Sequence, residues 1–98
     1  MPRVSHQALV VHPQGLHARP AALFVQLAKR FASDITVTKG RRRVDGKSIM
    51  GILTLAVETG AQVRITAKGP DAQEAVDRLC HFLSRRSDAE PQLRSTSA

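Results

Sequence analysis

Two segments of the chain alternate between apolar and polar positions, which is the pattern of a strand with one buried face. Residues 34–39 place Ile35 and Val37 on one side and threonines on the other. Residues 61–68 follow the same rule, with one aliphatic face and one polar face: Val63, Ile65 and Ala67 against Arg64, Thr66 and Lys68. We therefore predict two strands that each cover a core with one face.

Two further strands are indicated by composition and by turn residues. Residues 4–11 are largely apolar and precede the sequence His-Pro-Gln-Gly at 12–15, which is typical of a turn. Gly40 marks a turn after the strand at 34–39, so we expect a short return strand near 42–44. Gly60 marks another turn, just before the strand at 61–68.

Three segments show helical spacing or a helix start. A stripe at 3.6-residue spacing predicts a helix over 18–31: Phe24, Leu27, Ala28 and Phe31. A short helix is predicted over 48–53. Gly69-Pro70 ends the preceding strand, and Asp71 with Glu74 has the spacing of a capping box. The helix that follows has a continuous apolar face: Ala72, Ala75, Val76, Leu79, Phe82 and Leu83.

The predicted order is strand, helix, strand, strand, helix, strand, helix. One sheet face covered by the two longer helices gives a two-layer α+β domain. Periodicity ends after Leu83, where Ser, Arg, Asp, Glu, Pro and Thr dominate. We predict one domain over 1–84 and a disordered tail over 85–98, because 98 residues leave no room for a second domain.

Charge and composition limit the classes of function. The formal net charge is +7, no acidic residue precedes Asp34, and residues 39–47 carry five cations against one carboxylate. Such a surface attracts anions. The only aromatic residues are three phenylalanines, so stacking platforms for single-stranded nucleic acid are poorly supported and we do not expect a nucleic-acid partner.

The cysteine and histidine positions point to neither a disulfide nor a metal. Cys80 is the single cysteine, and we interpret it as a small core residue. His6, His12 and His17 lack the spacing of metal ligands on one element, so we expect no metal and no cofactor. The chain has no apolar run near 20 residues and no signal-peptide core, which predicts a cytoplasmic protein without membrane insertion.

The segment 15–22, Gly-Leu-His-Ala-Arg-Pro-Ala-Ala, carries the densest chemical signal. Pro20 favours the first turn of a helix, which places His17 at or next to the N-cap. An anion beside His17 would meet unpaired backbone N–H groups, the positive end of the helix dipole and the Arg19 guanidinium. These surroundings favour a neutral, nucleophilic imidazole that receives a phosphoryl group. A plain surface histidine at a helix start remains the alternative from spacing alone.

Two motifs of this sequence resemble a known family. Residues 15–21 resemble the phosphorylation site of HPr, the histidine phosphocarrier of the bacterial phosphoenolpyruvate:sugar phosphotransferase system. Residues 47–53, Lys-Ser-Ile-Met-Gly-Ile-Leu, resemble the regulatory serine site of the same family. The separation of the motifs and the order of elements also match, over about residues 4–84. The resemblance implies an open-faced sandwich, with a four-stranded antiparallel sheet covered on one face by helices.

The resemblance also implies roles for individual residues. His17 would accept a phosphoryl group on Nδ1 from phosphorylated enzyme I and pass it to an enzyme IIA domain, as a carrier and not as an enzyme. Arg19 would steady the group, and Ala18 and Arg19 would offer backbone N–H donors. Ser48 would be the target of an HPr kinase/phosphorylase where that enzyme exists. Partner docking would use an exposed apolar patch with two residues at its border: Ile49, Met50 and Leu53, with Phe24 and Lys29.

Several points stay open at this stage. The carrier could serve sugar uptake or a nitrogen-related regulatory relay, and the downstream acceptor is not identified. The rival from another functional class is a basic adaptor that binds protein or nucleic acid through Arg41, Arg42 and Arg43. Ser48 could be only an N-cap, and Ile49 and Met50 could be core residues. We expect a monomer.

Overall fold

The computed structural model of the protein describes residues 2–85. Of the predicted tail over 85–98, everything beyond Arg85 lies outside the described residues. The elements follow the predicted order of strands and helices. None of the helices within 2–85 is long and apolar enough to cross a membrane.

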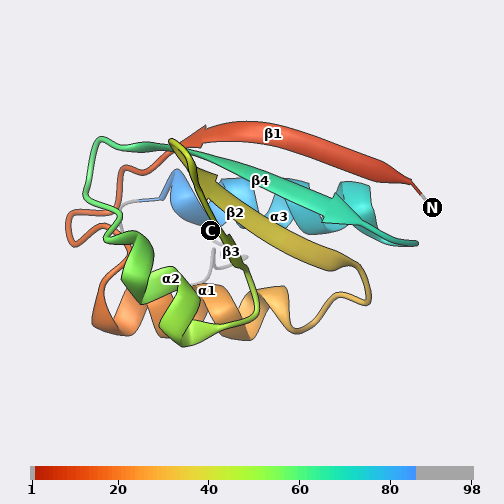
Figure 1. The fold of residues 1–98 in the computed structure, drawn as a ribbon, viewed down its shortest axis with the longest axis horizontal. Helices are drawn as coiled ribbons and strands as arrows, with labels where there is room; N and C mark the ends of the chain where they lie inside the picture. Colours follow the sequence, from red (N-terminus) through yellow and green to blue (C-terminus); the bar gives the residue numbers. More distant parts are fainter. Residues whose placement is uncertain (1, 86–98) are drawn as a thin grey trace, which may run out of the picture.

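Four strands form one antiparallel sheet in the order β1-β4-β2-β3 (Figure 1). Their bounds are β1 Arg3–Leu9, β2 Asp34–Lys39, β3 Arg42–Asp45 and β4 Gln62–Lys68. The predicted alternation is confirmed, because the aliphatic positions of β2 and β4 are buried while Arg64 and Lys68 are exposed. Gly40, with φ of 60°, opens the two-residue turn of the β2–β3 hairpin.

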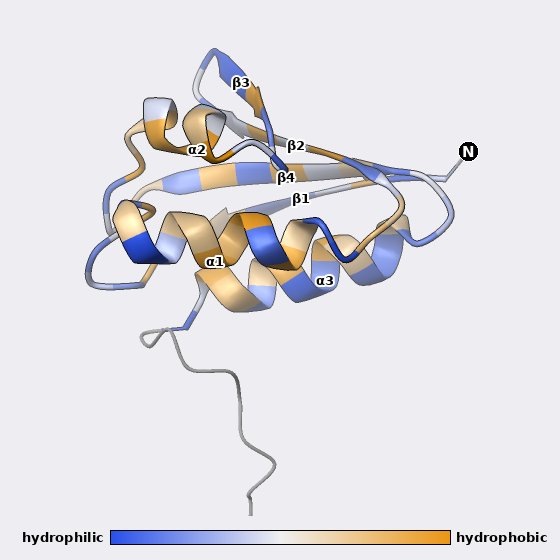
Figure 2. Cartoon of the chain, turned by 90° about the horizontal axis from the view of Figure 1, so that it is seen from below, coloured by the Kyte–Doolittle hydropathy of each residue, from blue (hydrophilic) through white to orange (hydrophobic). Residues whose placement is uncertain are grey.

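Helices cover one face of this sheet, which confirms the two-layer α+β prediction. Helices α1 (Ala18–Ala28) and α3 (Ala72–Leu83) lie side by side beneath it (Figure 2), and α3 packs against β1 and β4. Helix α2 (Ile49–Leu55) packs against α1 and β3. Phe24 of α1 and Phe82 of α3 meet edge to face, with ring centroids 6.2 Å apart, at the centre of the core.

Two elements end two or three residues earlier than predicted. The strand predicted over 4–11 ends at Leu9, because Val10 and Val11 leave the sheet and donate their N–H groups to Ala61 and Leu83 carbonyls. The helix predicted over 18–31 ends at Ala28. After it the chain makes a tighter, 3₁₀-type turn, in which the N–H groups of Arg30 and Phe31 donate to the carbonyls three residues before them.

The capping-box prediction for α3 is also wrong. Asp71 is the N-cap residue, but its side chain makes no capping hydrogen bond. Its carboxylate instead accepts the N–H groups of Ala32 and Ser33, each at 2.9 Å, and the Ser33 hydroxyl at 2.6 Å. Three donors from the α1–β2 loop satisfy the carboxylate better than one helix amide would. The Ser33 hydroxyl, followed by the Ala32 amide, lowers the pKa of Asp71.

Cys80 is only partly buried, where it packs against the core from α3. Burial, with the neighbouring Asp77 carboxylate, raises the pKa of its thiol. A raised pKa leaves less of the reactive thiolate, so Cys80 is a poor nucleophile.

Candidate functional site

His17 is the N-cap residue of α1, as the sequence predicts. Its backbone is extended, with φ of −111° and ψ of 152°, and its side chain is 42% exposed. In the part of the chain that the structure describes, the imidazole makes no hydrogen bond to the first-turn amides. The ring is therefore accessible, and it leaves this helix end without a side-chain cap of its own.

The backbone around His17 is unusual. Ala18 has φ of 46°, a left-handed conformation that costs about 1–3 kcal/mol for a residue other than glycine. Gly15 also has a positive φ, 60°, and a Cβ atom there would collide with the Val57 carbonyl oxygen. The Leu16 N–H donates to that same oxygen at 2.9 Å. The turn before His17 is thus fixed against the segment that follows α2.

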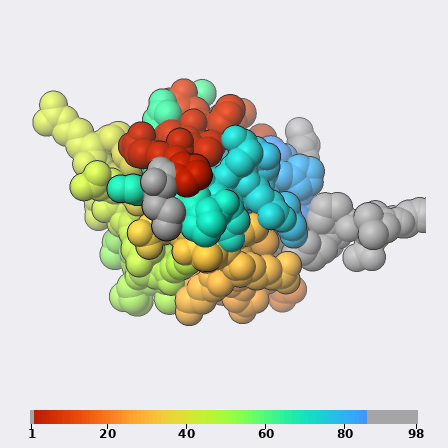
Figure 3. All heavy atoms as spheres, turned by 90° about the vertical axis from the view of Figure 1, so that its right-hand side faces the viewer, coloured from red at the N-terminus to blue at the C-terminus, as the bar shows by residue number. Residues whose placement is uncertain are grey.

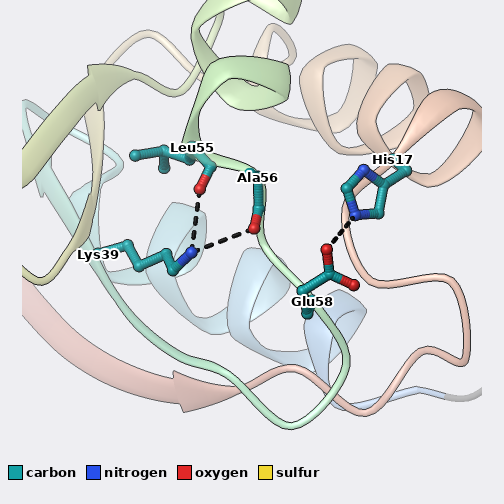
Figure 4. A network of polar contacts seen from close by, with 5 residues as sticks. All are labelled: His17, Lys39, Leu55, Ala56 and Glu58. Atoms are coloured by element: carbon teal, nitrogen blue, oxygen red, sulfur yellow. Dashed lines mark hydrogen bonds and ion pairs between the residues drawn. The ribbon is translucent and has the colours of Figure 1, made fainter.

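That segment brings an unexpected group to the histidine. Glu58 Oε2 lies 3.2 Å from His17 Nε2 (Figure 4), although the two residues are 41 positions apart. The Glu58 side chain is 74% exposed. The residues next to His17 in the sequence predict only positive surroundings, so this anion is unexpected. No spacing or motif could have revealed it, because the contact depends on the tertiary placement of the 56–60 loop.

The remaining groups of the 15–22 motif lie where an anion could meet them. Arg19 is exposed in the first turn of α1, and Pro20 is buried in the same turn. The helix start carries roughly half a positive charge. An anion attached to His17 would therefore sit beside a guanidinium and the amide end of a helix, a combination suited to phosphate oxygens.

Ser48 is the N-cap of α2, where its Oγ accepts the Gly51 N–H at 3.1 Å. The N-cap role, one of the two alternatives predicted for Ser48, is therefore present. Helix α2 extends from Ile49 to Leu55, slightly further than the predicted 48–53. Ala56 ends it in a left-handed conformation, and the Lys39 ammonium donates to the Leu55 and Ala56 carbonyls, both at 3.1 Å.

Three apolar side chains on the outer face of α2 form what we call the α2 patch. They are Ile49, Met50 and Leu53, which are 41%, 67% and 36% exposed. The alternative that Ile49 and Met50 are core residues is therefore wrong. Lys29, at the end of α1, is also exposed. The expectation that Phe24 borders the patch is wrong, because its ring is fully buried against Phe82 and cannot reach a partner.

The basic run at 39–47 is divided by the fold. Lys39 donates to the end of α2, and the Lys47 ammonium donates to the Phe31 carbonyl at 2.7 Å. Arg41, Arg42 and Arg43 are exposed around the β2–β3 turn, and the yellow-green hairpin projects from the body in Figure 3. Within residues 2–85, no group of three or more His, Cys, Asp or Glu side chains could hold a metal ion.

Comparison with known proteins decides the family. A family model described as the PTS HPr component phosphorylation site matches residues 4–85. This chain belongs to the HPr family. It is thus an HPr-type phosphocarrier protein of the phosphotransferase system, and both motifs quoted above lie inside the matched region.

Individual relatives of the HPr family are similar to this chain in sequence and in structure over most of its length. The HPr-like protein Crh of Bacillus subtilis is 52% identical over 70% of this chain and 81% of its own. Phosphocarrier protein HPr of Cupriavidus necator is 42% identical, over 79% and 86%. The crystal structure of HPr from Bacillus anthracis superposes with a TM-score of 0.83, at 46% identity over 84% and 98%. A crystal structure of the B. subtilis Crh protein has a TM-score of 0.69 at 48% identity, over 76% and 86%, and is described as a swapped dimer.

Proposed function

We propose that this HPr-family chain carries a phosphoryl group on Nδ1 of His17. The group comes from phosphorylated enzyme I, which obtains it from phosphoenolpyruvate, and goes on to an enzyme IIA domain. The observation that carries the proposal is the exposed imidazole at the start of α1, with Arg19 in the same turn. The α2 patch, which belongs to a helix packed against α1, is the proposed docking surface for both partners.

The transfer needs only groups on the two proteins. The lone pair on Nδ1 attacks the phosphorus in line, the P–N bond of the donor histidine breaks, and its electron pair returns to the donor ring. The helix start and Arg19 stabilise the charge on the phosphoryl oxygens. In the delivery step this chain is the donor: the acceptor histidine attacks the phosphorus, the Nδ1–P bond of His17 breaks, and its electron pair returns to the His17 ring. The chain ends each cycle unchanged.

The direct test is to incubate the protein with enzyme I, Mg²⁺ and phosphoenolpyruvate and to look for a phosphoryl adduct. We expect an acid-labile adduct on the wild-type chain and none on His17→Ala. The matched control is His81→Ala, which removes an exposed histidine of α3 and should leave the adduct unchanged. An adduct that survives in His17→Ala would overturn the assignment of His17.

A second candidate function is regulation through Ser48. It is favoured by the position of the Ser48 hydroxyl directly before the α2 patch and by the similarity to Crh, described as a catabolite repression protein. Incubation with an HPr kinase/phosphorylase and ATP should then give an acid-stable adduct that Ser48→Ala lacks. A chain modified only at Ser48, and never at His17, would favour this role over the relay.

The oligomeric state is part of the same proposal. We propose that the monomer is the active carrier, since the His17 site is formed within one chain. Light scattering of the purified protein checks this directly. A stable dimer, such as the one described for Crh, would contradict the monomer proposal.

A further inference from the structure

Glu58 is placed against His17 by several independent contacts. The turn that carries His17 is bonded to Val57, the residue before Glu58, through Leu16. Lys39 also binds the carbonyls of Leu55 and Ala56, where α2 ends (Figure 4). These contacts precede Glu58, and after it the Gly60 N–H donates to the Val10 carbonyl at 2.7 Å, so the backbone is held on both sides of Glu58. The fold therefore brings Glu58 next to the ring, although its side chain is 74% exposed.

The contact determines which ring nitrogen carries the proton. A carboxylate only accepts hydrogen bonds, so the nitrogen that faces Glu58 must be the donor. That nitrogen is Nε2, at 3.2 Å from Oε2. In the neutral imidazole the lone pair is then on Nδ1, which lies on the side of the ring away from Glu58 (Figure 4).

We propose that Glu58 is a positioning residue that keeps the proton on Nε2 of His17 and so presents Nδ1 as the nucleophile. The inference rests on the proposed phosphoryl transfer to Nδ1. When Nδ1 forms its bond to phosphorus, the ring gains a positive charge and the proton stays on Nε2. Glu58 compensates that charge, in the way a carboxylate supports a catalytic imidazole. On delivery the Nδ1–P bond breaks, its electron pair returns to the ring, and the ring is again neutral with its proton on Nε2.

The proposal is tested first on the unphosphorylated protein by ¹⁵N NMR of the His17 ring. In the wild type we expect one protonated nitrogen and one lone-pair nitrogen, with clearly separated shifts. Glu58→Ala should populate both tautomers and bring the two shifts closer together. Glu58→Gln should remain near the wild type, because its amide oxygen still accepts the Nε2–H bond. Ring shifts that are unchanged in Glu58→Ala would overturn the proposal.

The second measurement is the rate of phosphoryl transfer from enzyme I. For Glu58→Ala we expect kcat to fall about three- to tenfold with little change in KM, the range for a charge-assisted but exposed contact. Glu58→Gln should lie between it and the wild type, because it keeps the acceptor and loses the charge. Glu74→Ala, which removes an exposed carboxylate of α3, is the matched control and should behave as wild type. A change in KM alone would make Glu58 a docking residue and overturn the proposal.

The two measurements separate this inference from the proposed function. If the wild-type chain accepts no phosphoryl group at all, the proposed function fails, while the NMR comparison still decides what Glu58 does. If the wild type is phosphorylated and Glu58→Ala matches it in both measurements, only the inference about Glu58 fails.

Discussion

The starts of α1 and α2 differ in whether the N-cap side chain hydrogen-bonds to the first-turn amides of its helix. At α2 the Ser48 hydroxyl bonds to the Gly51 N–H, so the helix is capped by its own N-cap residue. At α1 the N-cap residue is His17, whose ring is directed to Glu58 and not to the amides of its helix. One end is closed for stability, and the other is left available to an external anion at a cost in backbone strain at Ala18.

This contrast separates two jobs that a helix start can do. A side-chain cap satisfies an amide permanently, and removing it costs about 1 kcal/mol. An end without such a cap contributes less to stability, but it keeps its donors and its dipole for a ligand. The HPr-family chain has a capped start on α2 and an uncapped start on the neighbouring α1. The following experiments test whether substitutions at each start have different effects on stability and on phosphoryl transfer.

The largest effect is expected from Gly15→Ala, which disrupts the turn before the uncapped start of α1. The new Cβ would collide with the Val57 carbonyl oxygen, and the left-handed φ of Gly15 adds strain. We expect phosphoryl transfer to fall more than tenfold and the free energy of unfolding to drop by roughly 1–3 kcal/mol. Transfer assays and denaturant unfolding measure the two losses. The control is Gly60→Ala, whose added Cβ meets no atom within 4 Å although its φ of 87° is also positive. Equal losses in both variants would show that strain alone matters.

Arg19→Ala tests the permanent charge at the same helix end. The fold should be intact, because Arg19 is exposed. We expect transfer from enzyme I to slow about tenfold, or about 1.4 kcal/mol, while binding to enzyme I changes less. Arg30→Ala, an exposed arginine just after α1, controls for net charge. Weaker binding with an unchanged transfer step would instead place Arg19 in the docking surface.

Ser48→Asp tests the start of α2, which the Ser48 side chain caps. Aspartate is as good an N-cap as serine, so α2 should remain folded, while the added charge next to the α2 patch should slow transfer several-fold. Ser48→Ala is the matched control: it should lower the free energy of unfolding by about 1 kcal/mol and leave transfer nearly unchanged. Transfer kinetics of Ser48→Asp equal to those of the wild type would remove the regulatory role of this position.

The smallest effect on phosphoryl transfer is expected from the third helix start, at Asp71. Its pKa is lowered by the Ser33 hydroxyl and the Ala32 amide, so the folded state favours the ionised carboxylate. The resulting stability is present above the ordinary carboxyl pKa and is lost as the pH falls through the lowered value in the folded state. Asp71→Asn should therefore weaken the decline of Tm below about pH 4. Asp77→Asn, another carboxylate of the α3 region, is the comparison, and equal acid profiles for Asp71→Asn and the wild type would contradict the assignment.

Sequence patterns predicted the elements well and their ends less well. Alternation in β2 and β4 and the apolar stripes of α1 and α3 identified the core, because burial on one face leaves a periodic trace. The end of α1 was missed because Phe31 stays buried after the helix has already ended. The Asp71 side chain was misassigned because its true partners lie about 38 residues away.

The candidate site was predictable only in its local part. His17 at the helix start follows from Gly15 and Pro20, whose backbone preferences act within a few residues. Glu58 could not be predicted, since its contact depends on how the 56–60 loop meets the 12–17 turn. The roles of Lys39 and Lys47 were equally hidden, because a lysine that binds a backbone carbonyl looks the same in sequence as one in solvent.

The bond between Leu16 and Val57 ties the earliest functional segment of the chain to one made much later. During synthesis, the ribosome completes the histidine motif long before it adds the loop that supports that motif. If His17 is the phosphoryl acceptor, as proposed, a nascent chain that stops between these points would contain the histidine motif without the contact that supports it. Uptake of a phosphoryl group by His17 would then indicate that the chain has folded at least as far as Val57, after α2.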